Sequence, residues 1–479
     1  MNEKINTLFA PLIAFLEHII FWDPFKFLGF NIGAPMPIIV LWLIAGAIFF
    51  TLKMRFVNFR CFKLAIDLVR GKYDKPEDKG EVTHFQALAT ALSATVGLGN
   101  IAGVAVAIST GGPGATFWMI VAGLLGMTSK FTECTLGLKY RKINSKGEVS
   151  GGPMHYIPVA FQRIKLPKTG KAFAILFSIL CVGGSFAGGN MLQSNQAFAQ
   201  LEVQFPMLNG YNLWIGIGMA VLTGSVIIGG LHSIARVAER IVPFMAILYV
   251  SCSLFIIFSN ITEMGAVAKL IFSEAFTGTA VKGGFLGVMI IGFRRACFSN
   301  EAGVGSASIA HAAAKTSEPV SEGIVALLEP FIDTVVICTM TALVIVFTGQ
   351  YNAGSIEGTA LTSRAFGSVI SWFPMLLTIA VFLFAFSTMI SWSYYGLKAW
   401  TWLFGETKIS TLSYKALYLI CTVLGCALSL KAVTDIGDMM ILSMAFPNII
   451  ALFILSGEVK VDLNKYLLKL KKPTLRANL

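Results

Sequence analysis

Hydrophobic residues fall into long runs along this chain, separated by short polar segments. One run, residues 85–129, contains no charged residue. A helix needs about 20 apolar residues to cross a bilayer, so this run predicts two spans joined by a turn at Gly111–Gly114. The same pattern predicts eleven spans over the whole chain, near 34–53, 86–109, 114–138, 172–196, 212–230, 238–259, 283–313, 322–348, 374–403, 411–430 and 434–456.

Two of these spans carry polar and glycine residues near their middle. The segment Thr95–Asn100 interrupts one of them, and Cys297–Gly303 interrupts the long run 283–313. A broken membrane helix exposes backbone N–H and C=O groups that lipid cannot satisfy. Two interrupted helices at matching positions are typical of the central binding site of a transporter. The pattern therefore indicates a solute site in the middle of the membrane.

Composition supports a membrane protein and excludes several other classes. The chain is 56% hydrophobic and 13% charged, whereas soluble domains are about a quarter charged. The net charge of +12 lies in short loops, so we expect no nucleic-acid partner and take the lipid bilayer as the surrounding partner. The eight cysteines are interpreted as small core residues. The five histidines are scattered and predict no metal cluster.

Basic residues also predict how the chain crosses the membrane. The segments 53–79 and 139–171 and the C-terminal tail are basic, and with eleven spans all three fall on one side. Cytoplasmic loops are enriched in Lys and Arg. The pattern thus predicts a multi-pass protein of the cell inner (plasma) membrane, with the N-terminus outside and the C-terminus in the cytoplasm.

The spans divide the chain into four parts. Residues 1–84 are predicted to hold a short interfacial helix (Leu8, Leu12, Phe15 and Ile19), one extra transmembrane helix and a basic cytoplasmic loop. Residues 85–260 and 261–457 each hold five spans and begin with an interrupted helix. Because five is odd, the second group enters from the opposite side, which makes an inverted repeat. Residues 458–479 are the basic cytoplasmic tail.

Several motifs resemble the alanine or glycine:cation symporter family, also called the sodium:alanine symporters. They occur in order over nearly the whole chain: Ala94–Ala105, Gly111–Met119, Gly151–Met154, Phe298–Gly303 and Glu329–Thr334. The resemblance implies an all-α, LeuT-type core of two inverted five-helix repeats with broken first and sixth core helices. Two departures are Ile120, where a second Trp is usual, and Leu98, where Thr is common; Leu98 instead matches the wider LeuT fold.

Candidate substrate ligands lie at both breaks. An amino-acid carboxylate suits backbone N–H groups at a helix end, which favours Thr95, Gly97, Gly99 and Asn100 at the first break. Ser299, Asn300 and Glu301 at the second break are candidates for the substrate ammonium, as is Gln193. The alternatives are glycines that only pack helices together, and polar residues that join helices or end one at the membrane surface.

Candidate cation ligands come from the resemblance to the LeuT fold. It implies backbone carbonyls of Ser93 and Val96, the carbonyl of Phe384, and the hydroxyls of Ser387 and Thr388. Asp333, near mid-membrane, is an additional candidate for cation or proton binding, with structural hydrogen bonding as the alternative. Ser and Thr hydroxyls also commonly bond carbonyls of their own helix.

Other charged residues inside the spans carry further hypotheses, because acids within a membrane are usually functional. Arg294 and Arg295 are predicted to face Asp435 and Asp438 and to form an outer gate. Glu133 follows Lys130 by three residues, which favours a simple ion pair.

The sequence therefore predicts a sodium-coupled symporter that imports alanine, glycine or serine, and not an enzyme. Sodium is the coupling ion, no cofactor is expected, and no obligate protein partner is evident. The open alternative is a proton-coupled amino-acid transporter, or another small-solute transporter, of the same fold. A channel is disfavoured because inverted broken helices fit an occluding transporter better than a continuous pore.

Overall fold

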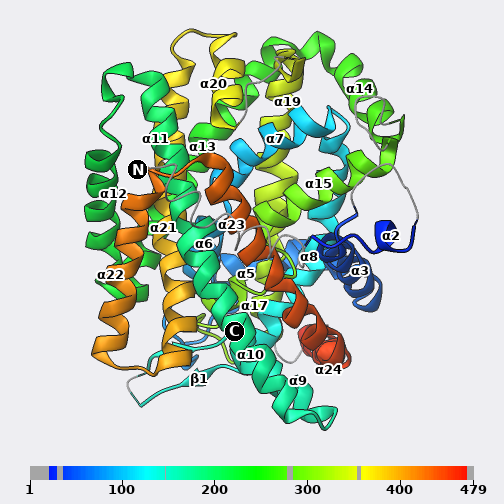
Figure 1. The fold of residues 1–479 in the computed structure, drawn as a ribbon. Helices are drawn as coiled ribbons and strands as arrows, with labels where there is room; N and C mark the ends of the chain where they lie inside the picture. Colours follow the sequence, from blue (N-terminus) through cyan, green and yellow to red (C-terminus); the bar gives the residue numbers. More distant parts are fainter. Residues whose placement is uncertain (1–20, 30–35, 146, 278–283, 353–357, 472–479) are drawn as a thin grey trace.

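The computed structural model describes residues 21–29, 36–145, 147–277, 284–352 and 358–471, which form one bundle of helices (Figure 1). α14 (Met264–Thr277) and α20 (Thr359–Gly367) lie at the end drawn uppermost, which we call the top end. β1 (Lys142–Ile143), which pairs antiparallel with β2 (Val149–Ser150), lies with α9 (Pro153–Arg163) at the bottom end. The predicted interfacial helix and residues 472–479 of the tail lie outside the described residues.

Long apolar helices dominate the described residues. Five stretches are long and apolar enough to cross a membrane, or six if one bent pair counts as a span. The five are Pro167–Gln204, Gly230–Ser259, Pro319–Phe347, Phe373–Phe404 and Leu430–Leu470. α3 (Ile38–Lys53) and α12 (Asn212–Ile227) are shorter apolar helices. The predicted all-α, polytopic membrane fold is confirmed, whereas the count of eleven spans is not.

Several long stretches are divided by local irregularities. A π-helical turn at Ala187–Met191 joins α10 (Pro167–Phe186) to α11 (Leu192–Gln204), and another at Phe331–Cys338 lies between α18 (Leu328–Pro330) and α19 (Thr339–Phe347). π-helical turns are rare and often occur at functional sites. Four helices flank the two breaks and are described below. The other helices are α2 (Pro24–Phe27), α4 (Val57–Arg60), α5 (Phe62–Val69), α8 (Ala115–Lys139), α13 (Gly230–Ser259), α17 (Pro319–Ala326), α21 (Phe373–Phe404), α22 (Lys408–Gly425), α23 (Leu430–Ser443) and α24 (Ala445–Lys471). Short 3₁₀ turns lie at Pro206–Leu208, Ile261–Glu263 and Gln350–Asn352.

The first break separates α6 (His84–Thr95) from a 3₁₀ turn (Leu98–Asn100) and α7 (Ala102–Gly111), and the two halves are bent by 56°. α6 begins with a capping box in which Thr83 and Gln86 exchange hydrogen bonds. The helix ends at Thr95: Val96 leaves the helical conformation with ψ 86°, and Gly97 is extended with φ −141° and ψ −150°.

The second break follows α15 (Gly284–Asn300) and precedes α16 (Ala307–His311). Glu301, Gly303 and Gly305 all have positive φ there, a conformation that is common for glycine and rare for glutamate. Both predicted interruptions are therefore present. The second begins at Glu301, four residues later than predicted, because α15 continues through Asn300.

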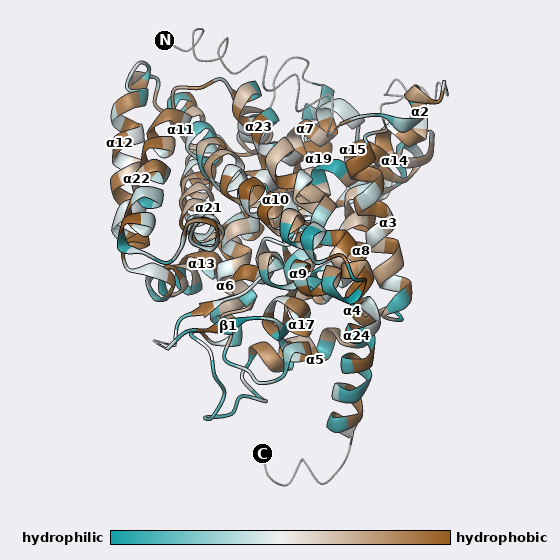
Figure 2. Cartoon of the chain, turned by 60° about the horizontal axis from the view of Figure 1, so that its bottom comes forward, coloured by the Kyte–Doolittle hydropathy of each residue, from teal (hydrophilic) through white to brown (hydrophobic). Residues whose placement is uncertain are grey.

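Surface polarity agrees with a membrane environment. Large apolar side chains are exposed on the outer helices, for example Trp214 and Val221 on α12, Phe244 on α13 and Leu412 on α22. Figure 2 shows hydrophobic colour along these helices, and hydrophilic colour on the bottom loops and on the C-terminal part of α24. Lipid stabilises such an apolar exterior, so the described helices are arranged as a multi-pass membrane protein.

Candidate functional site

The two helix breaks lie directly against each other in the centre of the bundle. A Cβ placed on Gly99 would lie 3.4 Å from the Ser299 Cα atom. α21 contacts α6, α10, α11 and α13, so it borders the same region. Segments about 200 residues apart in sequence therefore build one site.

An internal cavity of about 20 Å³ lies between the breaks. A space of about 10–15 Å³ by this kind of measure holds one water molecule, so the cavity is small. Its wall contains the predicted residues Thr95, Gly97, Gly99, Gln193, Ser299, Glu301 and Thr388, together with Ala94, Gly188, Phe298, Trp392 and Ile441.

Glu301 places an acidic side chain in the wall of this cavity. The carboxylate is 3% exposed, and it accepts hydrogen bonds from Ser306 Oγ and, at 3.1 Å, from Trp392 Nε1. Trp392 is a site residue that sequence reasoning missed. Its only signal is its position one turn after Thr388 on the same helix, which a single sequence cannot separate from ordinary core packing.

Gln193 reaches the first break from α11. Its Oε1 accepts a hydrogen bond from the Leu98 backbone N–H at 3.3 Å, and its Nε2 donates to the Gly188 carbonyl at 2.9 Å. Gln193 is thus fixed against the irregular backbone while it lines the cavity.

Asn100 and Asn300 lie beside the cavity and are not part of its wall. Asn100 accepts from the Gly97 N–H at 2.8 Å and donates to Asp333 Oδ1 at 2.6 Å. Asn300 donates to Thr334 Oγ1 and accepts from the Ala302 N–H. Both amides accept a hydrogen bond from a backbone N–H group at a break. Their side-chain hydrogen-bonding groups are therefore occupied by partners within the protein.

Asp333 is fully buried behind the two breaks. Its carboxylate accepts hydrogen bonds from Asn100, from Ser299 Oγ at 3.0 Å and from Thr334 Oγ1 at 2.6 Å. It therefore holds the two broken helices together through α18–α19. The contacts fit the structural alternative for this residue, and Asp333 does not line the cavity.

Most of the candidate cation ligands are brought together where α6 meets α21. Ser93 Oγ donates to the Ser387 carbonyl at 2.7 Å, and Ser387 Oγ donates to the Phe384 carbonyl at 3.0 Å. Thr388 Oγ1 is buried and has no hydrogen-bond partner among the described residues. Val96 is buried at the end of α6. This region supplies uncharged hydroxyl and carbonyl oxygens, which are the hard ligands that a monovalent cation takes.

The four predicted gate residues are not all in contact. Arg294 donates to Asp438 Oδ2 at 2.8 Å, and Arg295 lies 3.6 Å from the same oxygen. Asp435 instead pairs with Lys431 at 2.5 Å, one helical turn away. Arg295 and Asp435 line a second cavity of about 290 Å³, which shares Gly99 and Phe298 with the small central cavity. Arg295 thus borders a vestibule above the central cavity.

A buried charge cluster, defined as Lys130, Glu133, Glu329, His311, Glu322 and His84, lies on the bottom side of the breaks. Lys130 Nζ lies 2.9 Å from Glu329 Oε1 and 3.7 Å from Glu133 Oε1, so the predicted pair is part of a larger network. His84 and His311, scattered in the sequence, both contact Glu322. Among the described residues, no group of three or more acidic, His or Cys side chains is suited to hold a metal ion.

Comparison with known proteins shows which family has this architecture. The model of the sodium:alanine symporter family matches residues 29–477. The sodium/alanine symporter AgcS of Methanococcus maripaludis is 37% identical over 88% of this chain and 92% of its own length. The probable sodium/glutamine symporter GlnT of Bacillus subtilis is 36% identical over 90% and 87%.

The fold matches that of a LeuT-type transporter of known structure. The crystal structure of MhsT in complex with L-phenylalanine has a TM-score of 0.59 and 16% identity, over 78% of this chain and 89% of that one. The matches identify a cation-coupled amino-acid symporter, not an enzyme. The chain therefore belongs to the sodium:alanine symporter family.

Proposed function

We propose that this protein uses the sodium gradient to import a small neutral amino acid, namely alanine, glycine or serine. The observation that carries the proposal is the central cavity, whose wall offers glycine backbone on one side and the Glu301 carboxylate on the other. The backbone suits the substrate carboxylate and Glu301 suits its ammonium. Phe298, Trp392 and Ile441 leave little room for a side chain.

The relatives do not define the substrate of this protein, since one of them is described as a probable sodium/glutamine symporter. The bulky side chains of Phe298, Trp392 and Ile441 in the cavity wall are the reason to favour alanine, glycine and serine over glutamine. Binding even these substrates requires the wall to widen. We assign Thr95, Gly97, Gly99, Gln193, Ser299 and Glu301 to the substrate. Asn100 and Asn300 support the two breaks from behind.

We place the bottom end in the cytoplasm, because the basic segments 53–79 and 139–171 lie there and cytoplasmic loops are rich in Lys and Arg. The C-terminus is then cytoplasmic and the N-terminus outside. In this orientation the vestibule opens toward the outside. The inverted repeats 85–260 and 261–457 would move relative to each other and expose the cavity to each side in turn.

Sodium-driven uptake into proteoliposomes tests the function. Purified protein with a sodium gradient should accumulate labelled alanine, and an equal choline gradient should not support uptake. Unlabelled glycine and serine should compete, whereas glutamine and uracil should compete much less. Uptake driven by a pH gradient without sodium would instead support the proton-coupled alternative. Accumulation of glutamine in preference to alanine would contradict the proposed cargo.

The proposed sodium site is tested by Thr388→Val, which removes a hydroxyl and retains the shape of the side chain. Loss of one ligand of about 1–1.5 kcal/mol should raise the sodium concentration for half-maximal uptake roughly tenfold. Ser393→Ala is the matched control on α21, because Ser393 Oγ donates to the Ile390 carbonyl of its own helix. An unchanged sodium dependence in Thr388→Val would remove Thr388 from the site.

The proposed outer gate is tested by charge reversal at Asp438. Asp438→Arg would place a third cation beside Arg294 and Arg295; removing the partner of a buried charge costs about 3–5 kcal/mol. Uptake should fall by roughly 100-fold or more. Asp435→Asn should change uptake by less than about twofold, because an i,i+4 pair contributes about 0.3–0.5 kcal/mol. Full transport by Asp438→Arg would disprove the gate.

A further inference from the structure

The buried charge cluster is electrically balanced only if it holds protons. Glu133, Glu329 and Glu322 are 0% exposed, as are Lys130 and His311, and His84 is 4% exposed. Three carboxylates therefore face one lysine and two histidines. An unbalanced charge is costly in a site that excludes water. The cluster becomes neutral when both histidines are protonated, or when the same two protons lie on the acids.

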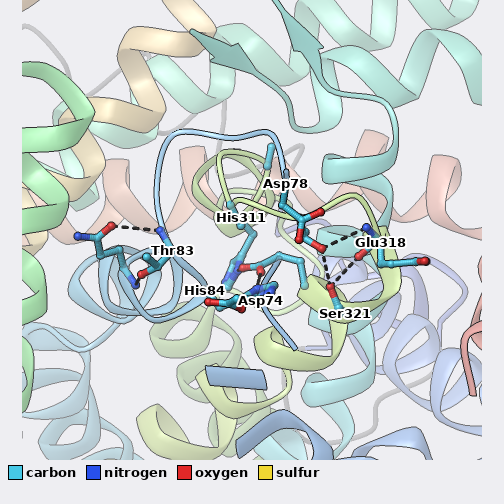
Figure 3. Close-up of polar contacts among 12 residues, drawn as sticks. Asp74, Asp78, Thr83, His84, His311, Glu318 and Ser321 are labelled. Atoms are coloured by element: carbon cyan, nitrogen blue, oxygen red, sulfur yellow. Dashed lines mark hydrogen bonds and ion pairs between the residues drawn. The ribbon is translucent and has the colours of Figure 1, made fainter. Parts of the chain in front are cut away.

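The contacts form a connected path from this interior to the bottom surface. His311 Nδ1 lies 2.5 Å from Glu322 Oε1, and His311 Nε2 lies 3.6 Å from Glu329 Oε2. His84 Nδ1 contacts the other Glu322 oxygen, and its Nε2 lies 3.8 Å from the half-exposed Asp74. Figure 3 shows His84, His311 and Asp74 in one group. Protons can thus reach the cluster from the bottom end.

The other charged groups around the cluster lie on every neighbouring element. Asp74 and Asp78 precede α6, Arg141 follows α8, and Glu239 on α13 accepts from Gln86 of α6. Glu301 faces the cavity, where the proposed substrate ammonium would balance it. Cys134 on α8, Tyr156 on α9 and Tyr395 on α21 are further titratable groups that face the acids of the cluster. The packed elements also carry Asp67 on α5, which pairs with Lys72, and Glu318, which pairs with Lys469 of α24.

The cluster also joins an element that can move. α6 is the bottom half of a broken helix, and such a break can act as a hinge. His84 is the first residue of α6, and twelve residues separate it from Val96 at the break. At 1.5 Å per residue, a swing of α6 moves His84 on a lever of about 18 Å. Opening of the bottom end by α6 would therefore separate His84 from Glu322 and expose both to water.

We propose that the buried charge cluster is a proton-binding site that holds its protons while the bottom end is closed and releases one from His84 when α6 swings outward. The released proton passes to the solution at the bottom end, and Glu322 keeps His311 as its partner. Protons on that side then oppose opening and slow substrate release, by linkage. The proposal rests on the proposed function, to which it adds a second ion.

The test uses membrane vesicles with the protein in its native orientation, the outer pH fixed at about 7.5 and the interior pH varied. A histidine in water loses its proton near pH 6.5, so sodium-driven alanine uptake should rise roughly fivefold between interior pH of about 6 and about 8. His84→Gln should show the same rate at both values. His232→Gln is the matched control, because His232 is 67% exposed and outside the cluster; it should retain the native pH profile.

A further measurement, the labelling of a buried cysteine, separates failure of the proton site from failure of the proposed function. Cys134 is buried among Ala91, Ala307 and Ala326, where α6, α8, α16 and α17 meet. Maleimide labelling of Cys134 is read by peptide mass spectrometry and divided by its labelling in the unfolded protein at the same pH, because the thiolate is the reactive form. This ratio should increase with pH in the native protein and not in His84→Gln. If no alanine uptake occurs, the proposed function fails and this labelling still decides the proton site. A native pH profile in His84→Gln, or pH-independent uptake and labelling in the native protein, would overturn the proposal.

Discussion

Gly97→Ala is expected to reduce sodium-driven uptake by roughly 10- to 100-fold. A Cβ on Gly97 would lie 2.5 Å from Thr388 Oγ1 and 3.3 Å from Gln193 Oε1. It would also project toward the cavity that we assign to the substrate. Extra volume in a packed site costs about 1–3 kcal/mol, and each 1.4 kcal/mol is about tenfold in binding. The effect should appear in uptake and in the substrate concentration for half-maximal rate.

Gly103→Ala is the matched control for this substitution. Gly103 lies on α7, beyond the same break, and a Cβ there would meet no atom within 4 Å. The added methyl group also favours the helix by about 1 kcal/mol. Uptake by Gly103→Ala should stay within about twofold of the native rate. If both substitutions reduced uptake equally, the broken helix would tolerate alanine at neither position. The assignment of Gly97 to the site would then lose its support.

The fold follows from local features of the sequence. Charge-free runs predict membrane helices because each span must satisfy its own backbone. Glycines predict the second break because Gly303 and Gly305 adopt positive φ there, which few other residues do. Glu301 is the exception, since it has positive φ of 53° within the second break. The number of spans was harder to predict, because α8 contains Lys130, Glu133 and Lys139 and is not distinguished by hydropathy.

The site could be predicted only where a motif carried the information. Seven of the predicted residues line the cavity, but Asn100 and Asn300 point to backbone and side-chain partners that the sequence does not reveal. Trp392 meets Glu301 across 91 residues, and His84 meets Glu322 across 238. Such pairs depend on how helices pack, and no spacing rule relates their positions.

Lys130→Met is expected to be the most destabilising single substitution proposed here. Lys130 is 0% exposed, and its ammonium lies 2.9 Å from Glu329 Oε1 and 3.7 Å from Glu133 Oε1. Methionine has a similar length, so the main effect is electrical: two carboxylates remain without their cation. Removal of one partner from a buried ion pair costs about 3–5 kcal/mol. The free energy of unfolding, measured by denaturant titration in detergent, should fall by that amount.

The double variant Lys130→Met/Glu329→Gln separates lost charge balance from lost packing. It removes one cation and one anion together, so the cluster would again hold equal numbers of both when the histidines are protonated. We expect it to recover at least about half of the lost stability, because replacing both members of a buried pair is often close to neutral. Lys72→Met is the surface control: its pair with Asp67 spans 3.6 Å and Lys72 is 61% exposed, so the change should stay within about 0.5 kcal/mol. No recovery in the double variant would mean that Lys130 acts through its packing, and the cluster would then need no charge balance to remain folded.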